Sequence, residues 1–293
     1  MSPDLALVRA LLELRGFPTS SVQPLEGGAW STAFAFDSGQ DALILRLGGS
    51  TEDYEADAFI ARLRPDGVPI PDVLAHGTID SGPLTGTTYA ISTRVPGTAL
   101  ERVSRSQWSV LVPQLADVLE SLRRRPAPAG HRVQDWRDHL LQVGSYPWQQ
   151  GWREHAMPAA IHLFDHGLDR LHETCPATVP VSLVHADWIN RNVHVENGRI
   201  TGIFDWGCYR FGDHLYDLAW LEFWAPWHRN LDLPLLVREL ESRWHAVGIA
   251  PLADPDRRRA CLLHIGLDHI VYNILHGTTQ ALLGTMERLA RYL

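Results

Sequence analysis

The first hundred residues alternate between strand-like and helical patterns of apolar positions. Phe34 and Phe36 face one way in an alternating run, and the turn Asp37-Ser38-Gly39-Gln40 leads into a second apolar run, which together predict a hairpin. Pro96-Gly97 closes this part of the chain. The patterns therefore predict a small sheet that carries one helix and follows a short N-terminal helix. The expected elements are helices at 2–16 and 54–63 and strands at 30–36, 42–47, 73–79 and 88–95.

Beyond residue 97 the spacing of apolar positions becomes mainly helical. Leu111, Leu115 and Leu122 recur on one helical face, and the stretch from Ile161 to Leu171 repeats this pattern. A strand-rich stretch at 181–205 interrupts the helices, which then continue to the end. The sequence therefore predicts an α+β protein with a small β-rich lobe at 1–97 and a larger, mainly helical lobe at 98–293.

The strand-rich stretch contains Asn197-Gly198, the strongest two-residue hairpin signal, because its turn requires positive φ at both central residues. If Glu196 lies opposite Arg199, then Asn192 lies opposite Ile203 and only two residues from Asp205. Diagonal neighbours in such a ladder are close enough for two side chains to meet one ion. Their oxygen atoms suit Mg²⁺, which takes one or two carboxylates together with phosphates and water.

The composition narrows the possible partners. Hydrophobic residues make up 45% and charged residues 20% of the 293 positions, which is typical of globular enzymes. The net charge of -8 argues against nucleic acid or an anionic membrane as the main partner. Three scattered cysteines, without a leader or membrane-spanning run, favour a reducing compartment and predict a cytoplasmic location. They are Cys175, Cys208 and Cys261.

One ordered set of polar residues carries a family resemblance. His185-x-Asp187-x-x-x-x-Asn192 followed by Asp205-Trp206-Gly207 has the spacing of the catalytic loop and the Asp-Phe-Gly element of protein kinases. Ala186, Trp206 and the absence of a following Ala-Pro-Glu argue against a protein kinase. The chain instead resembles the aminoglycoside and choline phosphotransferase superfamily, in which His-Gly-Asp is the usual form. It is most similar to the hygromycin B phosphotransferases, in segments 25–27, 185–187, 197–201, 211–213, 223–227 and 265–268.

The resemblance implies a two-lobed, protein-kinase-like fold. It also implies transfer of the γ-phosphoryl group of ATP or GTP to a hydroxyl of an aminoglycoside antibiotic, most closely hygromycin B. Asp187 matches the residue that orients or deprotonates this hydroxyl, and Asn192 and Asp205 match the Mg²⁺ ligands. His185, Asp213 and Asp217 match structural supports of the loop and the following helix.

The resemblance also places nucleotide-binding groups in the first lobe. Arg46 occupies the position of the kinase lysine that contacts the α/β-phosphates, with Glu55 as its helix partner and Asp57 as the rival. A turn would cover the nucleotide, and a hinge would meet the purine. Their residues are Gly27, Gly28, Trp30 and Ser31 in the turn and Ser92, Thr93 and Arg94 in the hinge. An ordinary turn, a strand-end arginine and a solvated helix face are the structural alternatives.

A polycationic acceptor requires carboxylates and aromatic rings in the second lobe. Trp136 and Trp224 are further aromatic candidates, although such residues more often pack in a core. Two other functions stay open: a kinase of another hydroxyl compound such as choline, homoserine, a macrolide or a different aminoglycoside, and a degenerate nucleotide-binding module. The sequence leaves open whether the protein is a monomer or a dimer. The acceptor-binding candidates are Asp135, Asp138, Glu222, Trp227 and Asp268.

Overall fold

The computed structural model describes residues 4–25, 31–250 and 254–293, and the chain divides into two compact units. One unit comprises Met1–Arg102 with Asn190–Tyr209, and the other comprises Val103–Ile189 with Arg210–Leu293. These units differ from the expected lobes because residues 190–209 join the first unit. The reason is a strand pairing: β8 (Val193–Glu196) of the Asn-Gly hairpin pairs with β6 (Thr98–Ala99), which directly follows Pro96-Gly97.

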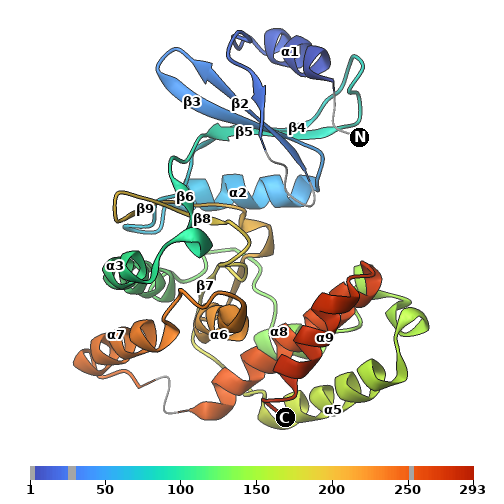
Figure 1. Ribbon diagram of the computed structural model, residues 1–293, viewed down its shortest axis with the longest axis vertical. Helices are drawn as coiled ribbons and strands as arrows, with labels where there is room; N and C mark the ends of the chain where they lie inside the picture. Colours follow the sequence, from blue (N-terminus) through green and yellow to red (C-terminus); the bar gives the residue numbers. More distant parts are fainter. Residues whose placement is uncertain (1–3, 26–30, 251–253) are drawn as a thin grey trace. The chain divides into compact units, whose positions relative to one another are not determined.

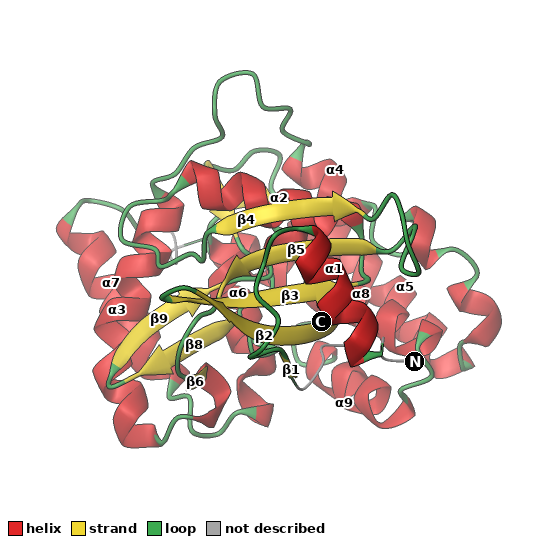
Figure 2. Ribbon diagram, turned by 90° about the horizontal axis from the view of Figure 1, so that it is seen from above, coloured by secondary structure: helices red, strands yellow, loops and turns green. Residues whose placement is uncertain are grey.

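The first unit is built on a five-stranded antiparallel sheet with the order β1-β2-β3-β5-β4. Helix α1 packs on one face and helix α2 lies on the other (Figure 1), and Figure 2 shows α1 crossing the strands. The predicted hairpin, helices and strands of this region are all present. Their bounds are α1 Leu5–Leu14, β1 Gln23–Pro24, β2 Thr32–Ser38, β3 Asp41–Leu47, α2 Thr51–Leu63, β4 Val73–Thr78 and β5 Thr88–Thr93.

Strand β3 gives the two faces of this sheet different chemistry. Side chains alternate along a strand, so Leu43 and Leu45 point into the apolar core beneath Val8 and Leu12 of α1. Arg46 points to the opposite face, toward α2. The core therefore fixes the register that places a single arginine on the helix α2 side.

The Asn-Gly hairpin forms a second, three-stranded sheet in the first unit, with the order β6-β8-β9. Glu196 pairs with Arg199 as predicted, but a bulge between His194 and Val195 shifts the register by one residue, so that Val193 lies opposite Ile203. The predicted pairing of Asn192 with Ile203 is therefore wrong by one position. The strands are β6 Thr98–Ala99, β8 Val193–Glu196 and β9 Arg199–Ile203, with short 3-10 helices η1 Leu100–Arg102 and η4 Trp206–Cys208.

Helix α8 is the central element of the second unit. It packs against α5, α6 and α9, as Figure 1 shows. A Cβ at Gly266 would lie 2.8 Å from Leu289 of α9 and 3.0 Å from Phe223 of α6, so glycine permits the close helix crossing. The helices are α3 Arg105–Arg123, α4 Trp136–Leu141, α5 Pro158–Thr174, α6 Leu215–Trp224, α7 Leu233–Ala246, α8 Pro255–Leu275 and α9 Thr279–Leu289.

Two strands of the second unit flank residues 185–209, the segment that begins with the catalytic loop. Strand β7 (Val181–Val184) pairs in antiparallel fashion with β10 (Arg210–Asp213). The sequence pattern predicts β7 but assigns β10 to the helical region. Three further 3-10 turns complete the unit, η2 Pro147–Gln149, η3 Trp152–His155 and η5 Ala225–Trp227. Among the described residues, no helix is long and apolar enough to cross a membrane.

Candidate active site

Arg46 is the centre of a charged cluster in the first unit. Its guanidinium pairs with Asp57 of α2, and Nη1 lies 3.7 Å from Asp205 Oδ1. The group also lies over the ring of Tyr54, 4.8 Å from its centroid. A planar guanidinium can contact two carboxylates at once, so Arg46 connects the helix to the segment that carries Asp205.

The helix carboxylate that pairs with Arg46 is Asp57, and the predicted pairing with Glu55 is wrong. Asp57 is only 6% exposed, whereas Glu55 lies on the exposed face of α2. Two residues along a helix correspond to a rotation of about 200°, because one turn takes 3.6 residues. Glu55 and Asp57 therefore point to nearly opposite sides, and the sequence alone does not identify the side that faces β3.

The turn after β9 presents Asp205 to solvent while it buries the next residue. Asp205 has left-handed backbone angles, with φ 64° and ψ 62°, and its side chain is 48% exposed. Trp206 is 1% exposed, and its indole N–H donates to the carbonyl oxygen of Ile203 at 3.1 Å. A Cβ at Gly207 would lie 2.6 Å from Asp53 Oδ1, so glycine lets this turn approach α2.

Asn192 and Asp205 lie at the same end of the hairpin. The backbone N–H of Phe204 donates to the carbonyl oxygen of Asn192 at 3.0 Å, so Asp205 is the next residue beyond this pair. The shifted register thus brings the two predicted ligands one position nearer than expected. Within the described residues, no group of three His, Cys, Asp or Glu side chains could hold a metal. One carboxylate and one amide oxygen fit Mg²⁺ that is completed by nucleotide phosphates and water.

The second unit carries the first part of the catalytic loop, up to Ile189, which includes Asp187. His185 is fully buried, and its Nδ1 accepts the backbone N–H of Asp187 at 3.2 Å. Through this contact His185 touches the loop backbone, and its bracing role stays a prediction. Ala186 has a left-handed backbone with φ 63°, and Trp188 is also fully buried. The loop is therefore anchored on both sides of Asp187, whose carboxylate is the candidate base.

Asp217 of α6 holds the backbone of this loop. Its two carboxylate oxygens accept the N–H groups of His185 at 3.1 Å and Ala186 at 2.8 Å. Burial raises the pKa of Asp217 to about 6, although these two bonds stabilise the charged form. Asp217 therefore contacts the loop backbone at two points, and its supporting role stays a prediction.

Asp213 has a different supporting role at the end of β10. Arg257 of α8 donates two hydrogen bonds to its carboxylate, at 2.9 and 2.7 Å. The same carboxylate accepts the N–H of Leu215 at 3.0 Å. Asp213 therefore connects β10 to the start of α6 and to α8.

Of the acceptor candidates, Asp268 has the most suitable surroundings. Gln149, itself fully buried, donates to Asp268 Oδ1 at 2.8 Å. Burial raises the pKa of Asp268 to about 7. A bound cation would favour the ionised form, so this carboxyl could gain its charge when a cationic ligand arrives.

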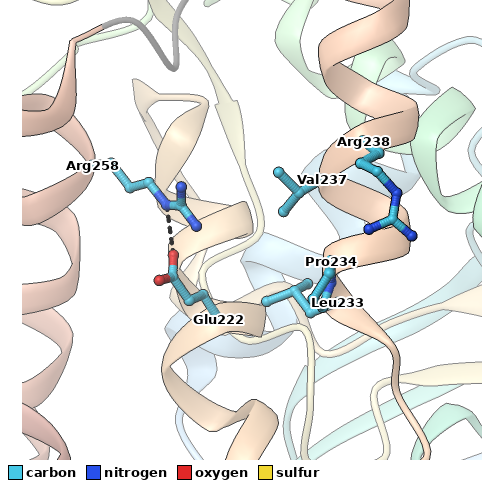
Figure 3. A pocket seen from close by; sticks show the side chains of 6 residues that line it. All are labelled: Glu222, Leu233, Pro234, Val237, Arg238 and Arg258. Atoms are coloured by element: carbon cyan, nitrogen blue, oxygen red, sulfur yellow. Dashed lines mark hydrogen bonds and ion pairs between the residues drawn. The ribbon is translucent and has the colours of Figure 1, made fainter.

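Two of the other acceptor candidates, Glu222 and Asp135, have competing structural contacts. Glu222 accepts a hydrogen bond from Arg258 at 2.6 Å. The pair lines an open groove of about 350 Å³ together with Leu233, Pro234, Val237 and Arg238. Figure 3 shows these side chains. Glu222 is therefore already neutralised by a neighbour.

Asp135 caps α4 by accepting the N–H of Asp138. Asp138 is exposed on the first turn of that helix, and Trp227 is 47% exposed.

The predicted nucleotide-binding residues lie partly within the described part of the chain. Gly27, Gly28 and Trp30 lie outside the described residues. Burial raises the pKa of the Tyr54 hydroxyl, and a hydrogen bond between the Ser31 and Tyr54 side chains partly offsets this rise. The N–H groups of Thr93 and Arg94 donate to the carbonyl oxygens of Asp72 and Ala42. These two N–H groups are thus used within the sheet, and purine binding near Ser92 stays a prediction.

Glu101, which no sequence pattern singles out, lies close to a predicted metal ligand. Glu101, in η1, accepts the N–H of Arg191 at 2.6 Å. Asn190 and Arg191 both have positive φ, 82° and 72°, and directly precede Asn192. Nothing in the spacing of Glu101 connects it to a residue 90 positions later, so only the folded chain reveals this contact.

The amino-acid sequence is similar to those of known phosphotransferases. Residues 21–261 match the phosphotransferase enzyme family. Hygromycin-B 4-O-kinase of Escherichia coli is 28% identical over 273 residues, which cover 88% of this chain and 76% of that protein.

Solved structures show the same similarity. A thermostable mutant of aminoglycoside phosphotransferase APH(4)-Ia, in a ternary complex with AMP-PNP and hygromycin B, matches with a TM-score of 0.81 and 28% identity over 97% of this chain and 96% of that one. An aminoglycoside phosphotransferase of the APH(2") type, bound to GDP and kanamycin, shares the fold with a TM-score of 0.72 and 15% identity over 99% and 98% of the two chains.

The structural matches confirm the predicted protein-kinase-like α+β fold. The family match spans most of the chain and includes the loop with Asp187 as well as Asn192 and Asp205. The chain therefore belongs to the phosphotransferase enzyme family, whose members include aminoglycoside kinases, and it is an enzyme of the kinase type.

Proposed function

We propose that this enzyme transfers the γ-phosphoryl group of ATP or GTP to a hydroxyl of an aminoglycoside antibiotic, with hygromycin B as the first acceptor to test. The main support is the ordered set Asp187, Asn192 and Asp205, in which the backbone around each acidic residue is held by a buried carboxylate. The similarity to a hygromycin B kinase and to a hygromycin B complex supports the choice of acceptor.

The proposed reaction assigns one task to each group. Asp187 accepts the proton of the acceptor hydroxyl as its oxygen bonds to the γ-phosphorus, and the bond from this phosphorus to the β-phosphate oxygen breaks to release the nucleoside diphosphate. Asn192 and Asp205 would hold Mg²⁺, which supplies charge neutralisation on the phosphates. Arg46 contributes a fixed positive charge to the same phosphates.

Acceptor binding is assigned to the second unit. Asp268 offers a carboxyl that a cationic amine would ionise, and Gln149 fixes its orientation. Trp227 offers an exposed ring that can pack on a sugar. We do not assign Glu222 to this role, because Arg258 already neutralises it.

The test is incubation of the protein with Mg²⁺, ATP or GTP and hygromycin B, followed by mass spectrometry of the antibiotic. A gain of one phosphoryl group supports the proposal. Phosphorylation of another compound in a panel of choline, homoserine, macrolides and other aminoglycosides would replace hygromycin B as the acceptor. Nucleotide binding without turnover of any acceptor would indicate a binding module.

Substitution of the candidate base gives a second test. Asp187→Asn keeps the shape of the side chain but removes its ability to accept a proton, so we expect kcat to fall by about 10²–10⁴-fold with nearly unchanged nucleotide affinity. Steady-state kinetics and calorimetric titration with AMP-PNP measure the two quantities. A wild-type kcat in this variant would show that another residue is the base.

A further inference from the structure

The backbone beside each predicted metal ligand is held by a carboxylate from a distant part of the chain. Asp57 Oδ1 accepts the N–H of Trp206, the residue after Asp205, at 2.7 Å. Glu101 Oε1 accepts the N–H of Arg191, the residue before Asn192, at 2.6 Å. All these residues belong to the first unit.

Both contacts are made where the backbone has left-handed angles. Asp205 has φ 64°, and Asn190 and Arg191 have φ 82° and 72°. Such angles cost free energy in residues other than glycine, and they persist only when surrounding contacts impose them. A charge-assisted hydrogen bond to the adjacent N–H is a contact of this kind.

The carboxylate of Asp57 contacts two groups at once. Its Oδ2 pairs with Arg46, while its Oδ1 faces Trp206. The carboxylate is 6% exposed, and burial strengthens hydrogen bonds by lowering the local dielectric constant. One turn earlier on α2, Asp53 packs against Gly207, which brings the helix close to the turn that carries Asp205.

We propose that Asp57 and Glu101 are positioning residues of the metal site, which set the directions of Asp205 and Asn192 through the neighbouring backbone N–H groups without touching the ion. This inference rests on the proposed function, because it takes Asn192 and Asp205 as the Mg²⁺ ligands. Partners of this kind commonly change metal affinity by about 10–100-fold when they are removed.

Two matched pairs of variants separate positioning from charge. Asp57→Asn and Asp57→Ala both remove the charge that faces Arg46, but only asparagine keeps an oxygen that can accept the Trp206 N–H. In the same way, Glu101→Gln keeps an acceptor for the Arg191 N–H and Glu101→Ala does not. The exposed α2 residue Glu52 provides the control Glu52→Ala.

The measured quantity is the affinity of Mn²⁺ for the protein saturated with AMP-PNP, followed by electron paramagnetic resonance or calorimetry, with thermal unfolding to verify folding. We expect each alanine variant to bind Mn²⁺ about tenfold more weakly than its amide counterpart, and Glu52→Ala to match the wild type. Equal affinities within both pairs would overturn the inference and leave the proposed function intact. Failure of the wild type to bind Mn²⁺ in the presence of the nucleotide would overturn the metal site and the inference together.

Discussion

Ala186 shows how a single residue in the catalytic loop departs from its family. The usual form of this motif has glycine between His and Asp, whereas this chain has alanine with φ 63°. A left-handed conformation costs an L-residue roughly 1–2 kcal/mol. The hydrogen bond from the Ala186 N–H to Asp217 and the buried neighbours His185 and Trp188 hold the loop in this shape.

Replacement of this alanine tests the strain directly. Ala186→Gly removes the steric cost but gives the unfolded chain more freedom, so we expect the free energy of unfolding to rise by up to about 1 kcal/mol. Urea unfolding measures this change, and kcat should stay near the wild-type value because glycine can keep the same angles. A loss of stability above about 1 kcal/mol would mean that the Ala186 methyl group packs more favourably than its backbone angle costs.

At the scale of elements, the sequence predicts the locally determined parts of the fold. The β2–β3 hairpin, α2 and α3 follow from apolar periodicity and turn residues, and the Asn-Gly turn sets the Glu196–Arg199 pair. The pattern does not predict β6, a two-residue strand that forms only because Val195 and His194 pair with it across almost one hundred residues. Short strands of this kind carry too few residues to show a periodicity of their own.

In the candidate site, as in the fold, some features depend on local sequence and others on contacts between distant residues. The spacing of Asp187, Asn192 and Asp205 predicts the phosphoryl-transfer chemistry, since these residues form one ordered motif. The choice between Glu55 and Asp57 depends on which side of α2 faces β3, and the contact between Glu101 and Arg191 depends on tertiary structure. Tertiary structure also determines the pairing of Glu222 in α6 with Arg258 in α8, which the local sequence around Glu222 does not indicate.

The connection between α6 and the catalytic loop gives a prediction at this scale. Asp217→Ala leaves the N–H groups of His185 and Ala186 without their acceptor in a buried position, so we expect a loss of about 2–4 kcal/mol in unfolding free energy. Asp217→Asn keeps one acceptor and should lose less. Urea unfolding followed by circular dichroism measures both changes.

The difference in unfolding free energy between the wild type and Asp217→Asn depends on pH. Because burial raises the pKa of Asp217 from 3.8 to about 6, the folded protein holds a proton that the unfolded chain has already released between these values. The stabilising contribution of Asp217 is therefore fully present below pH 4 and decreases as the pH rises through 6. The stability difference between the wild type and Asp217→Asn should be larger at pH 4 than at pH 8, and the opposite trend would exclude a raised pKa.

At the scale of the whole molecule, the net charge of -8 affects the two substrates of the proposed reaction in opposite directions. A polycationic aminoglycoside is attracted by the overall field, whereas a nucleoside triphosphate is repelled by it and depends on local groups such as Arg46. Dissolved salt screens this long-range field, with a Debye length of about 10 Å at 0.1 M and about 3 Å at 1 M. The enzyme should therefore respond to salt differently for each substrate.

The measurement is kcat/KM for hygromycin B and for ATP over a range of potassium chloride from about 0.05 to 0.5 M. We expect kcat/KM for the cationic acceptor to fall by about tenfold, while the value for ATP changes much less or increases. Sucrose at matched osmolality is the control for effects other than screening. If both values fall in parallel, then the salt acts on the chemical step or on the fold, and the acidic surface of the protein does not contribute to acceptor capture.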